Sequence, residues 1–378
     1  MTPISIQRLI GACALALASL LSACGGASST VNPVSSKVNP NIASARVIAF
    51  GDALSDVGAS GVRYTVNDAS AGGSMTVAER LAFTYGFTTM TAVTDTRALS
   101  GGAYSYAQGE ARVNTAGTAT SVATQVSNFL VNNKPGDNDL IVITAGSRDI
   151  IANATQYFAN AITADQAKAN VAQAALDLAT VIQQLTAAGA KHVLVLGPFS
   201  VARTPWGLSK GANYPNSSAD YKFLEQLSIL TSGDTSCGSF GCQLSAALVS
   251  RYPATSNGQP VLLADIAQYV NLITGTAAGG RDIYARPFPY PTGNLNTFAL
   301  ATASGVVLTN PDVPVCLANI TLATPCTLTT IKTNANNNNA VWDYATAVFA
   351  DDVNLTPAAQ RMIADYIYNT VEFRAAWR

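Results

Sequence analysis

The chain has 378 residues, of which 48% are hydrophobic and only 11% charged, and its formal net charge at pH 7 is -1. Its length is enough for one large or two modest domains with a buried core. The near-neutral charge argues against a nucleic-acid partner, because binding to nucleic acid calls for a basic surface.

The first residues read as a targeting segment. Arg8 precedes an apolar run, Leu9 to Leu21, that is too short to span a bilayer comfortably as a permanent helix. The letters LSAC follow and end at Cys24, and this pattern resembles a bacterial lipoprotein signal, in which the cysteine becomes the lipidated N-terminus. An ordinary secretory peptide is the alternative. Residues 1–24 are therefore predicted to be a signal peptide.

Residues 25–44 are rich in Gly, Ser, Asn and Pro, which predicts a flexible linker that cannot form a core. Gly25 stands after the lipid cysteine, where Asp would favour retention in the inner membrane of well-studied bacteria. We therefore expect an exported protein, lipid-anchored at the outer membrane of a Gram-negative bacterium, with one domain over 45–378.

That domain alternates strand and helix patterns. Four short apolar runs predict buried parallel strands, at 46–50, 140–145, 192–197 and 261–266. The strongest helix pattern lies between the second and third runs, where Thr163 and Gln166 form a capping box and Gly189 ends the helix. A final helix begins at Thr356, with Pro357 in its first turn.

Three stretches interrupt this pattern and are expected to be long loops that can include small hairpins: 59–107, 200–240 and 275–342. Strand-helix repetition predicts an α/β fold, a three-layer α/β/α sandwich around a central parallel sheet. In such a sheet, the loops after the strands build the functional site.

The cysteines of the domain form two local pairs, in CGSFGC and CLANITLATPC. Since an exported compartment favours disulfides, we expect Cys237–Cys242 and Cys316–Cys326, each closing a small loop. Zinc binding is the alternative, but the chain has one histidine and no CxxC. We expect no metal and no cofactor.

Four motifs appear in order along the domain. FGDALSDVG (50–58) leaves the first predicted strand at a corner of the kind that presents a nucleophile, but the corner carries Ala53. SYAQGEARV (105–113), ITAGSRDII (143–151) and VFADDVNLTPAAQ (348–360) follow. Together they resemble the signature blocks of the SGNH/GDSL ester hydrolases, a family of lipases and esterases with a flavodoxin-like fold. Four ordered motifs are more specific than any one of them.

The resemblance assigns a role to each position. In that family a serine attacks the ester carbonyl, a histidine removes its proton, and an aspartate three residues earlier orients the imidazole. These positions hold Ala53, Asn354 and Asp351 here. The family's oxyanion hole combines the nucleophile's N–H, a glycine N–H and an asparagine amide, which correspond to Ala53, Gly109 and Arg148.

Two of the replacements carry opposite charge. Glu110 takes the place of a family glycine and Arg148 that of the asparagine, and both positions should face the same pocket. We hypothesise that the two form a salt bridge that fills the space of a substrate carbonyl. Two independent surface substitutions are the alternative.

Two other residues could in principle replace the missing groups. Ser55 is expected to cap the following turn, because active members commonly carry both serines. His192 stands at the amino end of its predicted strand, about 20 Å from the end where sites form.

Four altered signature positions favour natural loss of activity over a single engineered change. The prediction is a catalytically inactive, SGNH/GDSL-like envelope lipoprotein, a monomer. Its expected partners are the membrane, through the lipid anchor, and an ester, lipid or glycan ligand. Membership of an active carboxylesterase or lipase lineage is one alternative, and a different reaction in the same cleft using Asp and Arg residues is another.

Overall fold

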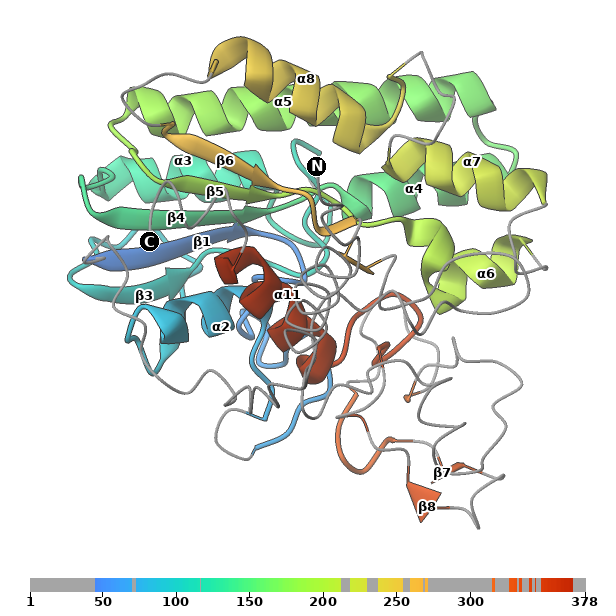
Figure 1. Cartoon of the computed structure of the whole chain (residues 1–378), viewed down its shortest axis with the longest axis horizontal. Coiled ribbons are helices and arrows are strands. Elements are labelled where there is room, and N and C mark those ends of the chain that lie inside the picture. The colour runs from blue at the N-terminus through green and yellow to red at the C-terminus, as the bar shows by residue number, and fades with distance from the viewer. Residues whose placement is uncertain are drawn as a thin grey trace, which may run out of the picture.

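Six parallel strands form one central sheet in the computed structural model of the chain (Figure 1). In chain order they are β1 (Arg46–Gly51), β2 (Met90–Ala92), β3 (Gly102–Ser105), β4 (Asp139–Thr144), β5 (Val193–Leu196) and β6 (Val261–Ala264). Side by side they run β2-β3-β1-β4-β5-β6, and each neighbouring pair is parallel. The structure describes residues 45–69, 73–115, 117–211, 218–229, 237–253, 259–267, 269–270, 315–316, 326–331, 333–334, 340–341, 344 and 348–369.

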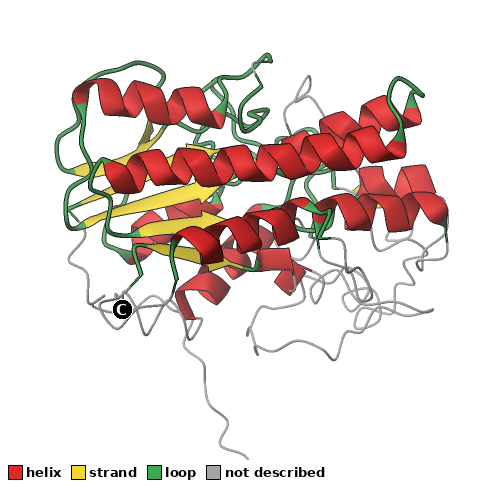
Figure 2. Cartoon of the chain, turned by 90° about the horizontal axis from the view of Figure 1, so that it is seen from above, coloured by secondary structure: helices red, strands yellow, loops and turns green. Residues whose placement is uncertain are grey.

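Helices cover both faces of the sheet, and successive strand residues point to opposite faces. Ile48 and Phe50 of β1 join one buried cluster, whereas Val47 and Ala49 join another. The first cluster includes side chains of α3 (Val122–Asn132), α4 (Ser147–Phe158), α5 (Ala164–Ala187), α7 (Ala219–Ser228) and α8 (Phe240–Arg251). The second includes α2 (Val77–Thr84) and α11 (Pro357–Asn369). Figure 2, seen from above, shows long helices covering the strands. Because the two clusters place helices on both faces of the sheet, the predicted three-layer α/β/α fold is confirmed.

The strongest predicted helix forms as α5, and its start follows from local chemistry. The Thr163 hydroxyl accepts from the Gln166 N–H at 3.2 Å, and the Gln166 side chain accepts from the Thr163 N–H at 2.8 Å. Gly189 follows the helix with a φ of +113°, a conformation that glycine adopts without steric cost. The predicted strands agree with β1, β4, β5 and β6 to within two residues at either end.

The expectation of long loops at 59–107 and 200–240 was wrong. The first stretch contains α2, β2 and β3, and the second contains η2 (Val201–Arg203), α6 (Pro205–Gly211) and α7. Pro205 is the first residue of α6, a position that proline suits because its missing N–H would be unpaired there anyway. Strands β2 and β3 are too short to show a period of two, and pairing places them in the sheet.

Of the third stretch, 275–342, the described part includes a two-stranded antiparallel pair, β7 (Thr333–Asn334) and β8 (Ala340–Val341). Both predicted disulfides are confirmed, with Cα–Cα distances of 5.3 Å for Cys237–Cys242 and 5.7 Å for Cys316–Cys326. The predicted signal peptide, its Cys24 and the linker lie outside the described residues. In the part of the chain that is described, no helix is both long and apolar enough to cross a membrane.

Candidate active site

The motif residues gather at the carboxyl end of β1. This strand lies between β3 and β4, so the order of strands reverses here, and such a reversal opens a crevice at the strand ends where ligands bind in α/β sheets. Ala53 and Gly109 lie in the loops after β1 and β3, and Arg148 lies in the first turn of α4, the helix that follows β4. The fold thus brings together three positions that are far apart in sequence.

The corner after β1 is held tightly against β4. Gly51 has a φ of +129°, and a Cβ there would lie 1.8 Å from the Thr144 carbonyl oxygen, so only glycine fits. The Thr144 hydroxyl donates to the Ser55 hydroxyl at 3.0 Å, and Ser55 is fully buried. The expectation that Ser55 caps the following turn was therefore wrong. Asp56 caps it instead, accepting from two backbone N–H groups at 2.8 Å each.

Asp351 and Asn354 are bonded to each other. One carboxylate oxygen of Asp351 accepts from the Asn354 backbone N–H at 2.8 Å, and the other accepts from the Asn354 side-chain amide at 2.9 Å. Burial raises the pKa of the Asp351 carboxyl, while the hydrogen bonds from Asn354 oppose that shift. Asp351 orients an amide where the family has an imidazole, and an amide cannot exchange a proton near neutral pH.

Arg148 connects this pair to the other side of the site. Its Nε donates to the Gly109 carbonyl oxygen at 3.0 Å, and its Nη2 donates to the Asn354 Oδ1 at 3.1 Å. The same Nη2 lies 3.2 Å from Glu110 Oε1, so the hypothesised ion pair is present, although that contact lacks hydrogen-bond geometry. The Arg148 side chain is 5% exposed and that of Glu110 is 22% exposed. A continuous polar network runs from Asp351 through Asn354 and Arg148 to Glu110.

Tyr64, which the sequence did not single out, covers the network. Its ring lies against Gly109 so closely that a Cβ on that glycine would sit 2.0 Å from ring carbons. The Arg148 Cζ lies 5.5 Å from the centre of the same ring, within the range of a cation–π contact. Burial raises the pKa of the Tyr64 hydroxyl to about 12, so this side chain is neutral at physiological pH.

Most donors at the predicted oxyanion positions are already engaged in hydrogen bonds within the protein. The Gly109 N–H already donates to Asp56 Oδ2 at 2.8 Å. Where the resemblance predicts a side-chain amide, the guanidinium of Arg148 bonds the Gly109 carbonyl oxygen and Asn354 Oδ1. Of the three predicted donors, the Ala53 N–H alone has no hydrogen-bond acceptor among the described residues.

Little space remains above Ala53. The cavity there has a volume of about 20 Å³, which is room for about one water molecule. Small-molecule sites usually measure about 300–1,000 Å³. The cavity is lined by Asp52, Ala53, Leu54, Tyr64, Ser147, Arg148, Ile151, Phe199, Val201, Thr204, Val353, Asn354 and Leu355. The site is therefore closed to an acyl group in this structure.

Two other carboxylates near the site accept hydrogen bonds from backbone N–H groups. Asp52 accepts from the Leu54 N–H at 3.4 Å, and the Val113 N–H donates to both oxygens of Asp149, at 3.3 and 3.1 Å. Burial raises the pKa of Asp52, and it raises that of Asp149 to about 7. Within the described ranges, no group of three or more His, Cys, Asp or Glu residues could hold a metal ion.

His192 takes no part in the site. It directly precedes β5, and its carbonyl accepts from the Ile141 N–H, so it lies toward the amino ends of the strands. The closed site is at the carboxyl ends, across the length of the sheet. Burial lowers the pKa of the His192 imidazole.

A family model described as GDSL-like Lipase/Acylhydrolase matches residues 47–367. One similar solved structure is a member of the lipolytic protein G-D-S-L family from Veillonella parvula DSM 2008; it is 10% identical, the alignment covers 62% of this chain and 87% of that chain, and the TM-score is 0.31. No curated protein matches.

Proposed function

The chain belongs to the family of GDSL-like lipases and acylhydrolases, and we propose that it is a member in which the ester-hydrolysis site has become a closed, non-catalytic one. Ala53 has no oxygen with which to attack a carbonyl, and Asn354 cannot act as a general base. The kept aspartate, Asp351, accepts hydrogen bonds from the Asn354 backbone and side-chain N–H groups and from the Val353 N–H.

The position of the Arg148 guanidinium carries this proposal. It bonds the Gly109 carbonyl and the Asn354 amide oxygen, within 3.1 Å of each, where an active member needs space for the substrate. The cavity left is about 20 Å³. The loss is thus not confined to two missing reactive atoms, because the space and the donors that would serve them have been reused for internal contacts.

A rough scale for the lost rate comes from serine proteases, in which removal of the triad costs about six orders of magnitude in turnover. The residual rate in such variants comes from the oxyanion hole and from substrate binding. Here the Gly109 N–H already donates to Asp56, and the cavity is only about 20 Å³. We therefore expect no residual catalysis from this source either.

We further propose that the protein is an envelope lipoprotein, acylated at Cys24 and joined by the 25–44 linker to a domain that begins near residue 45. The sequence pattern before and after Cys24 is what supports this. The domain would then have a binding or structural role at the outer membrane, and an ester, lipid or glycan is the class of ligand that its family suggests.

Ester hydrolysis is the direct test. The full chain should release p-nitrophenol from p-nitrophenyl acetate and butyrate no faster than a buffer blank. A Ser55→Ala variant is the matched control, since Ser55 carries the hydroxyl closest in sequence to Ala53, the position of the missing nucleophile. Hydrolysis by the wild-type protein that disappears in Ser55→Ala or Asp351→Asn would overturn the proposal and favour membership of an active carboxylesterase lineage.

A further inference from the structure

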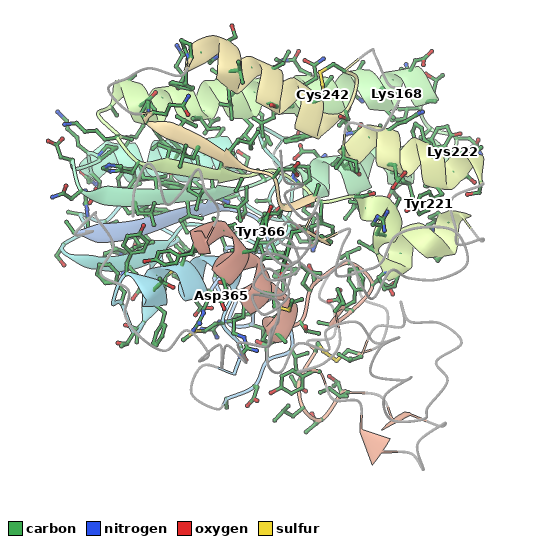
Figure 3. All side chains as sticks on the ribbon, in the orientation of Figure 1. Lys168, Tyr221, Lys222, Cys242, Asp365 and Tyr366 are labelled. Atoms are coloured by element: carbon green, nitrogen blue, oxygen red, sulfur yellow. A yellow bond between two sulfur atoms is a disulfide. The ribbon has the colours of Figure 1, made fainter. Side chains whose placement is uncertain are left out.

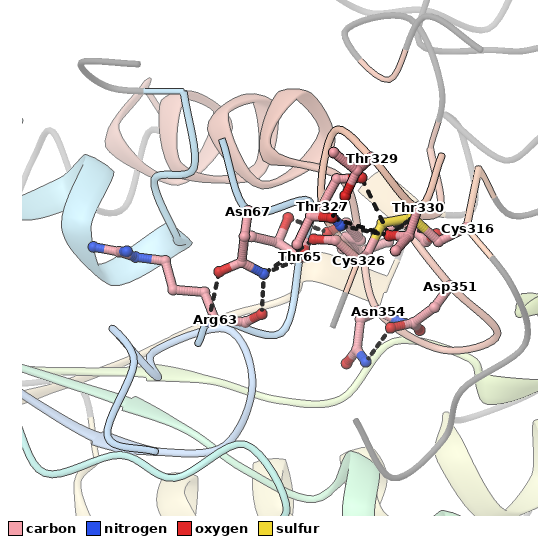
Figure 4. Close-up of a disulfide and its surroundings, with 12 residues drawn as sticks. Arg63, Thr65, Asn67, Cys316, Cys326, Thr327, Thr329, Thr330, Asp351 and Asn354 are labelled. Carbon is pink, nitrogen blue, oxygen red and sulfur yellow. Dashed lines mark hydrogen bonds between the residues drawn. A yellow bond between two sulfur atoms is a disulfide. The ribbon is translucent and has the colours of Figure 1, made fainter. Parts of the chain in front are cut away.

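Tyr64 lies in a short loop, residues 63–67, whose backbone is held by hydrogen bonds to the Asn67 side chain (Figure 4). The Asn67 Oδ1 accepts from the Arg63 N–H at 2.9 Å. The Asn67 Nδ2 donates to the carbonyl oxygens of Arg63, at 2.9 Å, and of Thr65, at 3.1 Å. Any displacement of Asn67 therefore loosens the backbone on either side of Tyr64.

Asn67 also fastens this loop to one half of a disulfide. Its backbone N–H donates to the Cys326 carbonyl oxygen at 2.7 Å, and its Nδ2 donates to the same oxygen at 3.2 Å. An isolated parallel bridge pairs Asn67 with Thr327. The position of Cys326 thus determines where the Tyr64 loop lies.

The other half of the disulfide is fastened to the segment that holds the degenerate triad. The Cys316 N–H donates to the Ala350 carbonyl oxygen at 2.8 Å, and the preceding Val315 N–H donates to the Phe349 carbonyl oxygen at 3.1 Å. Ala350 directly precedes Asp351, and Figure 4 shows the Asn354 amide bonded to the Asp351 carboxylate. A small buried cluster surrounds the sulfur atoms, and it consists of Val66, Val315, Cys316, Cys326, Ile331 and Ala350.

We propose that the Cys316–Cys326 disulfide keeps the site closed, because it joins the loop that carries Tyr64 to the segment that carries Asp351 and Asn354. The bond fixes the two anchoring residues at a Cα–Cα distance of 5.7 Å. Among the described residues, the Thr65 hydroxyl also donates to the Leu355 carbonyl oxygen at 2.7 Å, and this direct hydrogen bond between the loop and the segment does not depend on the disulfide. Closure then depends on the redox state of this disulfide.

This inference rests on the closed site of the proposed function and adds a condition for closure. Hydrogen exchange on the full chain, followed by peptide mass spectrometry, tests it in the double variant Cys316→Ser/Cys326→Ser. Backbone amides of residues 63–67 and 350–354 should exchange about tenfold faster, the change that loss of one or two net hydrogen bonds gives to a local opening equilibrium. Exchange in α5 and β4 should be unchanged.

The second disulfide supplies the matched control. Cys237–Cys242 joins the residues before α8 to its first turn, and Figure 3 shows Cys242 in the helical layer opposite α11. The variant Cys237→Ser/Cys242→Ser should speed exchange near α8 and leave residues 63–67 protected. Equal exchange of 63–67 in the wild-type protein and in Cys316→Ser/Cys326→Ser, or equal acceleration in both double variants, would overturn the inference.

Reduction of the folded protein covers the case in which the cysteine variant does not fold. Cys237→Ser/Cys242→Ser is treated with a phosphine reductant, so that Cys316–Cys326 is the disulfide cleaved, and exchange is compared before and after. Residues 63–67 should again exchange faster, and their unchanged protection would refute the role of the disulfide. Ester hydrolysis that appears on reduction would count against the proposed loss of activity while supporting the disulfide's role in closure.

Discussion

Replacing Arg148 by methionine should destabilise the protein more than any surface charge change. Methionine keeps the length and much of the volume of the side chain but removes the guanidinium. The variant loses hydrogen bonds to the Gly109 carbonyl and to Asn354 Oδ1. It also loses the ion pair with Glu110 and the cation–π contact with the Tyr64 ring. The change in the free energy of unfolding therefore measures how much these contacts of the closed site stabilise the fold.

The size of the effect can be estimated from these contacts. Hydrogen bonds that involve a charged group contribute roughly 1.5–3 kcal/mol each, and removal of one member of a buried network leaves its partners unsatisfied. The share from Glu110 is small, about 0–1 kcal/mol, because its side chain is partly exposed and its contact with Arg148 lacks hydrogen-bond geometry. The desolvation cost of burying the guanidinium is absent in the variant, and this offsets part of the loss. We expect the free energy of unfolding to fall by about 3 kcal/mol.

Urea unfolding of the full chain, followed by circular dichroism and tryptophan fluorescence, measures this change. Arg97→Met is the matched control, since Arg97 also forms an ion pair, with Asp95 at 2.6 Å, but both side chains are more than half exposed. Such exposed pairs contribute about 0.2–1 kcal/mol. If Arg148→Met costs no more than Arg97→Met, the polar network does not stabilise the fold and the reasoning fails.

Three further predictions follow from the same geometry. The double variant Ala53→Ser/Asn354→His should hydrolyse p-nitrophenyl butyrate no faster than wild type, because the cavity stays filled; clear turnover would mean that the site opens readily. Gly109→Ala should lower the free energy of unfolding by about 1–3 kcal/mol through a clash with the Tyr64 ring, and a double-mutant cycle with Tyr64→Ala should recover most of that cost, whereas additive losses would contradict the contact. Burial raises the pKa of Asp149 from 3.8 to about 7, so the folded state keeps a proton that the unfolded state has released, and stability falls as pH rises through that window. In urea titrations at pH 4 to 7, Asp149→Asn should therefore lose less stability than wild type, and parallel curves would refute the shift.

The parts of the fold that were predictable from the sequence are those encoded by neighbouring residues. Apart from Arg46 and Thr144, the runs at 46–50 and 140–145 are apolar, because β1 and β4 are covered on both faces. The start of α5 follows from the Thr163–Gln166 capping box alone. The Glu110–Arg148 contact could be anticipated because parallel strands end at the same edge of the sheet, which places the loop after β3 beside the start of the helix after β4.

The parts that the sequence did not reveal depend on contacts between distant segments. Tyr64 reaches Gly109 because its loop is bonded to Leu355, through a hydrogen bond between residues 290 positions apart, and no local pattern encodes that. The capture of the Gly109 N–H by Asp56 is equally non-local, at a separation of 53 residues. Both contacts bear on whether the site is open, so motif matching alone could identify the altered residues but not the closure.

The close approach of Tyr64 to Gly109 has an evolutionary consequence. An aromatic ring that leaves no room for a Cβ keeps a glycine under selection for packing, whether or not the residue still serves a reaction. Motif searches count that glycine as a retained part of the catalytic apparatus. In a lineage that has stopped hydrolysing esters, the same letter can be preserved by a new constraint, so the survival of a signature residue measures the demands of the fold as well as those of chemistry.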